Sequence, residues 1–136
     1  MLRSGRYSAD GALMATRMTQ NEAREHRIAM EAVIDAYDEI ERAMGWYYYL
    51  EGKLALPFRA CCIAKRAISP LKIGKEVDVL AMAPEEECES EMFVTIDYGG
   101  DSLAVPLAQL ECLSTNEETV EAVSDWHYWA AQGYQF

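Results

Sequence analysis

The densest group of acidic side chains lies in one short segment, residues 84–91, whose sequence is PEEECESE. Calcium is a hard cation that takes about six to eight oxygen ligands from carboxylates, backbone carbonyls and water. An exposed loop of this composition supplies all three kinds of ligand, so the segment predicts an irregular calcium site. A solvated turn that binds nothing explains the same residues, because hydrated carboxylates are common at protein surfaces. The expected ligands in this loop are Glu85, Glu86, Glu87, Glu89 and Glu91.

Other acidic groups in the sequence lead us to expect that several segments converge on this loop. Like charges held close together raise one another's proton affinity and oppose folding, and a bound divalent cation removes both penalties. We therefore predict that the groups share one or two calcium ions, with affinity in the micromolar range or weaker because few ligands are arranged in advance. The residues are Asp35, Asp38, Glu39 and Glu51 on a predicted helix, and Asp97 and Asp101 beside a Gly-Gly turn.

The segment DYGGD at residues 97–101 does not form an EF-hand. An EF-hand loop needs glycine at its sixth position and glutamate at its twelfth. In this chain glycine comes too early, and the twelfth position of the loop is Ala108. Magnesium fits a flexible acidic surface less well than calcium, because it requires a strict octahedron and keeps its waters. The expected ion is therefore Ca²⁺, bound outside any EF-hand.

Residues that would indicate an enzyme are missing from the sequence. His26 and His127 have no partner at metal-ligand spacing, and no nucleophile motif, phosphate-binding glycine loop or dinucleotide fingerprint is present. None of the four cysteines forms a C-x-x-C pair. A hydrolase built on carboxylates would need a pocket that drives two carboxyl pKa values apart. We expect a binding protein and not an enzyme.

The charge balance restricts the partners. The 136 residues carry 12 Lys and Arg against 23 Asp and Glu, a formal net charge of −11, so nucleic acids and anionic membranes would be repelled. Unpaired cysteines suit a reducing compartment, and no apolar stretch reaches the roughly 20 residues that a membrane span needs. We expect a cytoplasmic monomer. The alternative function is a protein interaction module whose acidic face docks a basic partner and has no metal role.

The pattern of apolar residues predicts a single α+β domain over residues 21–136, after a disordered leader at residues 1–20. A helical period begins at Asn21 and should end near Gly52. A second helix should begin with a capping box of Thr115 and Glu118 and end at Gly133. Between them we expect a small five-stranded antiparallel SH3-like barrel, or an open sheet packed on a helix. The predicted strands are Arg59–Ala67, Lys75–Met82, Met92–Tyr98, Ser102–Pro106 and Glu111–Leu113.

The chain also resembles the CcbP family of small acidic calcium-binding proteins of cyanobacteria and other bacteria. The resemblance runs from Ala32 to Phe136, and it implies calcium binding by an irregular acidic surface in the cytosol, with a role in buffering or sensing the ion. Family members tend to carry an acidic residue at the position of Gly52, so a ligand there would be missing from this chain. The matching stretches include DAYDE at 35–39, AMGWYYYLE at 43–51, LPF at 56–58, ISPL at 68–71, MAPEEEC at 82–88, LAVPL at 103–107 and DWHYW at 125–129.

Overall fold

A computed structural model describes residues 21–132 of the chain. The predictions of a disordered leader at residues 1–20 and of a helix end at Gly133 lie outside the described residues. Residues 21–27 are α-helical and continue into the π-helical turn η1 (Ile28–Ala32). The remaining elements are α2 (Glu39–Lys53), β1 (Phe58–Cys62), β2 (Glu76–Met82), η2 (Glu85–Cys88), β3 (Phe93–Tyr98), β4 (Asp101–Pro106), η3 (Leu107–Gln109), β5 (Leu110–Cys112) and α3 (Glu117–Ala131).

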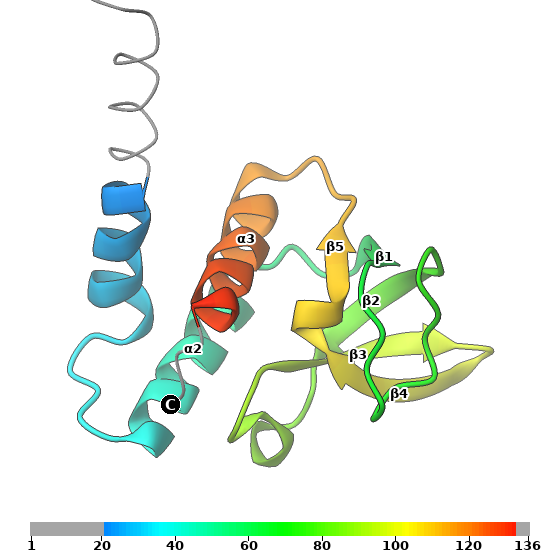
Figure 1. Ribbon diagram of the computed structural model, residues 1–136, viewed down its shortest axis with the longest axis horizontal. Helices are drawn as coiled ribbons and strands as arrows, with labels where there is room; N and C mark the ends of the chain where they lie inside the picture. The colour runs from blue at the N-terminus through cyan, green and yellow to red at the C-terminus, as the bar shows by residue number, and fades with distance from the viewer. Residues whose placement is uncertain (1–20, 133–136) are drawn as a thin grey trace, which may run out of the picture.

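The five strands form one antiparallel sheet in the order β4-β3-β2-β1-β5. Figure 1 shows the helices on one side of the molecule and the sheet on the other. The β3–β4 hairpin turns at Gly99 and Gly100, whose φ angles of 62° and 91° carry no Cβ penalty in glycine. The predicted α+β fold with five antiparallel strands is therefore confirmed. Within the described residues, no helix combines the length and the apolar character that crossing a membrane requires.

Strand β1 is shorter than predicted. The expected strand ran to Ala67, but the ladder ends at Cys62, whose backbone N–H and C=O bond to Lys75 and Gly74 across the base of the β1–β2 loop (both 2.8 Å). The next residue, Ile63, donates its N–H to the carbonyl of Gln109. The apolar residues beyond this point belong to a loop, which residue type alone did not distinguish from a strand.

The N-terminal helical region is broken, where one continuous helix from Asn21 to Gly52 was predicted. Residues 33–38 form a turn in which Asp35 has a φ of 57°, and Asp38 then caps α2 by accepting a hydrogen bond from the Glu41 N–H (2.8 Å). Asp and Asn adopt such left-handed angles and cap positions more readily than most residues. The prediction that one helix carries Asp35, Asp38, Glu39 and Glu51 is therefore wrong, because Asp35 and Asp38 lie in the turn that precedes α2.

Helix α3 begins one residue later than predicted. Asn116, and not Thr115, is the N-cap, and its side chain accepts hydrogen bonds from the N–H and the hydroxyl of Thr119 (2.9 and 3.1 Å). Asn serves as well as Thr at this position, so the capping residue cannot be chosen from propensity alone. The tryptophans of α2 and α3 pack together, since the ring centroid of Trp46 lies 5.1 Å from that of Trp126 and 5.6 Å from that of Trp129.

A buried carboxylate joins the three helical segments. The side chain of Asp125 on α3 is fully buried, and it accepts hydrogen bonds from Arg24 (3.1 Å), from two nitrogens of Arg27 (2.7 and 2.8 Å) and from the hydroxyl of Tyr49 (2.9 Å). Burial raises the pKa of Tyr49, and its hydrogen bond to Asp125 raises it further. Each charge in this cluster has a partner, as a buried ion pair requires.

Candidate metal centre

The acidic loop between β2 and β3 is anchored by buried residues and presents its carboxylates to solvent. Cys88, at the end of η2, is buried, and its sulfur lies 3.4 Å from the N–H and 3.5 Å from the carbonyl of Phe93. Ala83, just before the loop, is also buried. The exposed residues are Glu86, Glu87 and Glu89, while Glu85 and Glu91 are half-buried. The short 3₁₀ turn η2 is therefore anchored by buried residues, and its glutamate side chains extend toward solvent.

Two tyrosines of α2 attach that helix to the start of the loop. The buried Tyr47 donates its hydroxyl to the carbonyl of Ala83 at 2.7 Å. Its neighbour Tyr48, 56% exposed, donates its hydroxyl to Oε1 of Glu85. The two rings meet edge to face with their centroids 5.6 Å apart. The loop is thus held against the second half of α2, where Glu51 also lies.

Carboxylates from both α2 and the loop raise the pKa values of these two tyrosines. The pKa of Tyr48 is raised, first by its hydrogen bond to Glu85, then by burial and by the negative charges of Glu85 and Glu51. The pKa of Tyr47 is raised mainly by burial, and the charges of Glu51 and Glu85 add to the effect. Glu51 and Glu85 are therefore close enough to act on the same phenol groups.

We call this region the α2–η2 acidic surface, and we define it by five carboxylates that lie on the second half of α2 or on the loop. Within residues 21–132, none of the five forms an ion pair with a lysine, arginine or histidine. Among the described residues, only the Tyr48 hydroxyl, which bonds to Glu85, relieves their mutual repulsion, and solvent and mobile ions do the rest. The five residues are Glu51, Glu85, Glu86, Glu87 and Glu89.

Glu91, the last acidic residue of the predicted loop site, has a different role. Both of its carboxylate oxygens accept hydrogen bonds from the guanidinium of Arg66, which comes from the β1–β2 loop. A bidentate pair of this kind neutralises the carboxylate and fixes its direction. Glu91 therefore connects two loops, and its charge is already balanced by a cation of the protein.

The other predicted ligands lie away from the α2–η2 acidic surface. Asp38 and Glu39 are at the start of α2, and about 18 Å of helix axis separates Glu39 from Glu51 at about 1.5 Å per residue. Asp35 lies in the turn before them. Asp97 and Asp101 flank the β3–β4 turn, at the opposite end of β3 from η2. The structure thus brings Glu51 to the loop, but it does not gather all the predicted segments at one point.

No metal cage is formed in advance in the described part of the chain. Among residues 21–132, no group of three or more His, Cys, Asp or Glu side chains is arranged to hold a metal ion. The residues present still suit calcium, because exposed carboxylates, loop carbonyls and water are the ligands this ion takes. An ion at the α2–η2 acidic surface would order its own ligands, which costs conformational free energy and weakens binding.

Sequence reasoning missed the residues that position the loop. In the aromatic run WYYY at residues 46–49, Trp46, Tyr47 and Tyr49 are buried in the core, whereas Tyr48 is exposed. Helical spacing places Tyr48 three residues before Glu51 and so on the acidic face, a signal that was available. Its partner Glu85 is 37 residues away, and only the tertiary fold reveals that contact.

Comparison with known proteins gives a consistent result. A family model of the CcbP type, described as calcium binding, matches residues 26–130. The chain is similar to the crystal structure of Anabaena CcbP, with 43% identity and a TM-score of 0.76, over 85% of this chain and 94% of that chain. It is also similar to the structure of a calcium-binding protein in the calcium-binding form, with 44% identity, a TM-score of 0.75 and the same coverage. No curated protein sequence matches the chain.

Proposed function

Because the chain belongs to the CcbP family of calcium-binding proteins, we propose that it binds calcium through the α2–η2 acidic surface, without an EF-hand. One observation carries the choice of this surface: five carboxylates on the loop and on the adjoining half of α2 have no cationic partner in the described residues, and tyrosine hydrogen bonds hold their loop in place. Other exposed acids either have cationic partners or lie away from the loop. A bound calcium ion would supply the positive charge that the protein does not provide at this surface.

The role we propose is buffering or sensing of intracellular calcium. An exposed site without a preformed cage exchanges its ion readily and binds in the micromolar range or more weakly. Its affinity should fall as salt rises, because mobile ions screen exposed carboxylates. The four cysteines are free, which agrees with a reducing compartment. The exposed carboxylates bind and release an ion in this proposal, and we assign no catalytic step to them.

Neutralising two carboxylates of the loop should weaken calcium binding. In the double variant Glu85→Gln/Glu87→Gln we expect the calcium Kd to rise by about tenfold, equivalent to about 1.4 kcal/mol, because amide oxygens carry no net charge for a hard cation. Isothermal titration calorimetry at physiological salt, with excess magnesium present, measures this change. Both side chains reach solvent, so the fold should persist.

The matched control is Asp97→Asn/Asp101→Asn, which removes the same charge at the opposite end of β3. It should change the Kd by less than about threefold, since exposed charges more than about 10 Å apart are screened. If the control weakens binding as much as the loop variant does, the ion is not localised on the α2–η2 acidic surface. If the parent chain gives no saturable heat, calcium is not its ligand, and the acidic face is better explained by a basic protein partner.

A further inference from the structure

The cations of this acidic chain are concentrated in one stretch that the calcium proposal does not use. Six of its 12 Lys and Arg residues lie between Lys53 and Lys75, a stretch that contains no Asp or Glu. Three of the six pair with acids from elsewhere: Lys53 with Glu31 and Glu118, Arg59 with Glu76 and Asp78, and Arg66 with Glu91. Within residues 21–132, the other three, Lys65, Lys72 and Lys75, form no ion pair.

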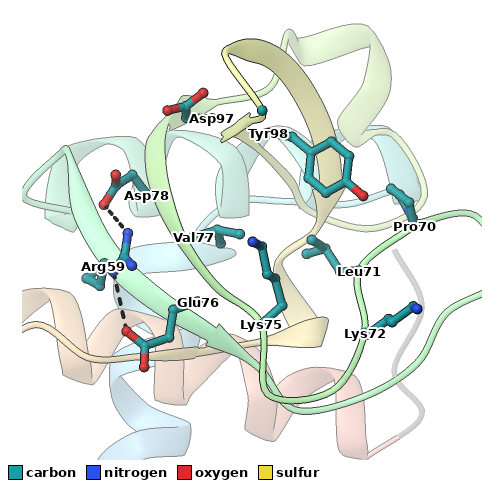
Figure 2. A pocket seen from close by; sticks show the side chains of 11 residues that line it. Arg59, Pro70, Leu71, Lys72, Lys75, Glu76, Val77, Asp78, Asp97 and Tyr98 are labelled. Carbon is teal, nitrogen blue, oxygen red and sulfur yellow. Dashed lines mark hydrogen bonds and ion pairs between the residues drawn. The ribbon is translucent and has the colours of Figure 1, made fainter.

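Two of these unpaired lysines, Lys72 and Lys75, line a hollow in the described structure. The hollow has a volume of about 510 Å³ and lies between the β1–β2 loop and the β3–β4 hairpin. Figure 2 shows the Lys75 ammonium between the side chains of Val77 and Leu71, with the ring of Tyr98 close by. We call this the Lys75 hollow; its lining includes Arg59, Leu71, Lys72, Lys75, Asp97 and Tyr98.

The carboxylates near the hollow are already engaged. Glu76 and Asp78 both contact the guanidinium of Arg59, at 3.5 and 3.1 Å, and Figure 2 shows both contacts. Asp97 lies opposite Asp78 in the β2–β3 ladder and accepts a hydrogen bond from the Gly100 N–H at 3.1 Å. Glu76 and Asp78 thus share Arg59 and Asp97 bonds to its own turn, while the Lys75 ammonium lies more than 4 Å from every carboxylate in the described chain.

We propose that the Lys75 hollow binds a small organic anion, whose carboxylate or phosphate group lies on Lys75 and whose apolar body packs on Leu71 and Tyr98. Lys75 is an exposed residue, so the attraction of its ammonium for an anion comes from its unpaired charge at a concave surface and should weaken as salt rises. A volume of about 300–1,000 Å³ is typical of ligand sites. Six charged side chains line this hollow, and Leu71, Val77 and Tyr98 supply its apolar surface.

The geometry also restricts the ligand. Asp97 also lines the hollow, so a ligand with several spread negative charges would be repelled by its carboxylate. A compact anion with an apolar or aromatic body avoids this repulsion and uses the half-exposed Tyr98 ring, which is 39% accessible. This site is independent of the calcium proposal, since the hairpin and η2 lie at opposite ends of β3.

Amide NMR spectra of the full chain test the proposal with four defined probes. Phenyl phosphate and phenylacetate each join an anionic group to an aromatic body, inorganic phosphate has only the charge, and benzyl alcohol has only the body. We expect the first two to shift resonances around Leu71, Lys75 and Tyr98 in a saturable way, the stronger one identifying phosphate or carboxylate as the preferred group. Inorganic phosphate should bind at least about fivefold more weakly, and benzyl alcohol should not saturate.

Variants make the test specific. Lys75→Gln should weaken phenyl phosphate binding by about tenfold, while Lys65→Gln, on the same loop but outside the hollow, should leave it unchanged. Tyr98→Ala should reduce phenyl phosphate to the affinity of inorganic phosphate. Equal effects of the two lysine variants, or shifts that sodium chloride reproduces at equal ionic strength, would overturn the proposal. Calcium titration of Lys75→Gln should match that of the parent chain, so the two proposed sites succeed or fail separately.

Discussion

Replacing Asp125 by alanine is expected to lower the free energy of unfolding by about 3–5 kcal/mol, the largest loss we expect from a single substitution in this chain. The side chain is completely buried and accepts hydrogen bonds from Arg24, Arg27 and Tyr49. Removing it leaves two guanidinium groups without their shared anion and a buried phenol without its acceptor. Domains of this size are stable by about 5–15 kcal/mol, so the variant should be near the limit of folding.

Urea unfolding monitored by tryptophan fluorescence measures this loss, and Glu121→Gln is the control. Glu121 lies on the same helix and contacts the same Arg27 at 3.4 Å, but its side chain is 48% exposed. Exposed pairs contribute less than about 1 kcal/mol, so the control should unfold close to the parent midpoint. Asp125→Asn keeps the size of the side chain, so its loss of unfolding free energy should lie between those of Asp125→Ala and Glu121→Gln. If Asp125→Ala and Glu121→Gln lose equal stability, the cluster does not hold the helices together.

Substituting alanine for Gly45 should destabilise the protein by about 2–3 kcal/mol, although alanine is the better helix former. A Cβ atom at this position would lie 2.1 Å from the backbone oxygen of Ala32, because η1 packs directly on α2 there. A backbone atom cannot move aside as a flexible side chain can. The clash therefore outweighs the gain of about 1 kcal/mol in helix propensity.

Gly52→Ala provides the matched comparison in the same helix. A Cβ at Gly52 would meet no atom within 4 Å, so only the propensity gain remains, and we expect a rise in stability of up to about 1 kcal/mol. Thermal unfolding followed by circular dichroism would show the two midpoints moving in opposite directions. Parallel shifts would mean that Ala32 does not pack on Gly45 as described.

The sequence predicts the regular elements well because their signals are local. Alternating apolar residues mark β2 and β3, the Gly99-Gly100 pair marks the β3–β4 hairpin, and a helical period marks α2 and α3. The turn at residues 33–38 was missed because the apolar period continues through it. Its causes are the close approach of Ala32 to Gly45 and the cap at Asp38, which the fold creates.

The candidate site was predictable only in part, for the same reason. The composition of the segment at residues 84–91 points to its carboxylates, but it cannot show that Arg66 neutralises Glu91. The spacing on α2 also places Tyr48 and Glu51 on one face. The contact of that face with Glu85, however, joins residues more than 30 positions apart in the sequence, which local patterns cannot predict. Charge counts show how many acids exist, whereas pairing decides which of them remain available for a cation.

Amide NMR spectra of the chelator-treated protein, recorded before and after addition of millimolar calcium, test the central claim most directly. Our account predicts that the resonances that move come from residues 83–90 and from the second half of α2, including Tyr48 and Glu51. They should return to their original positions when chelator is added again. Spectra that do not change, or changes confined to the Asp97–Asp101 hairpin or the Asp35–Glu39 turn, would contradict it.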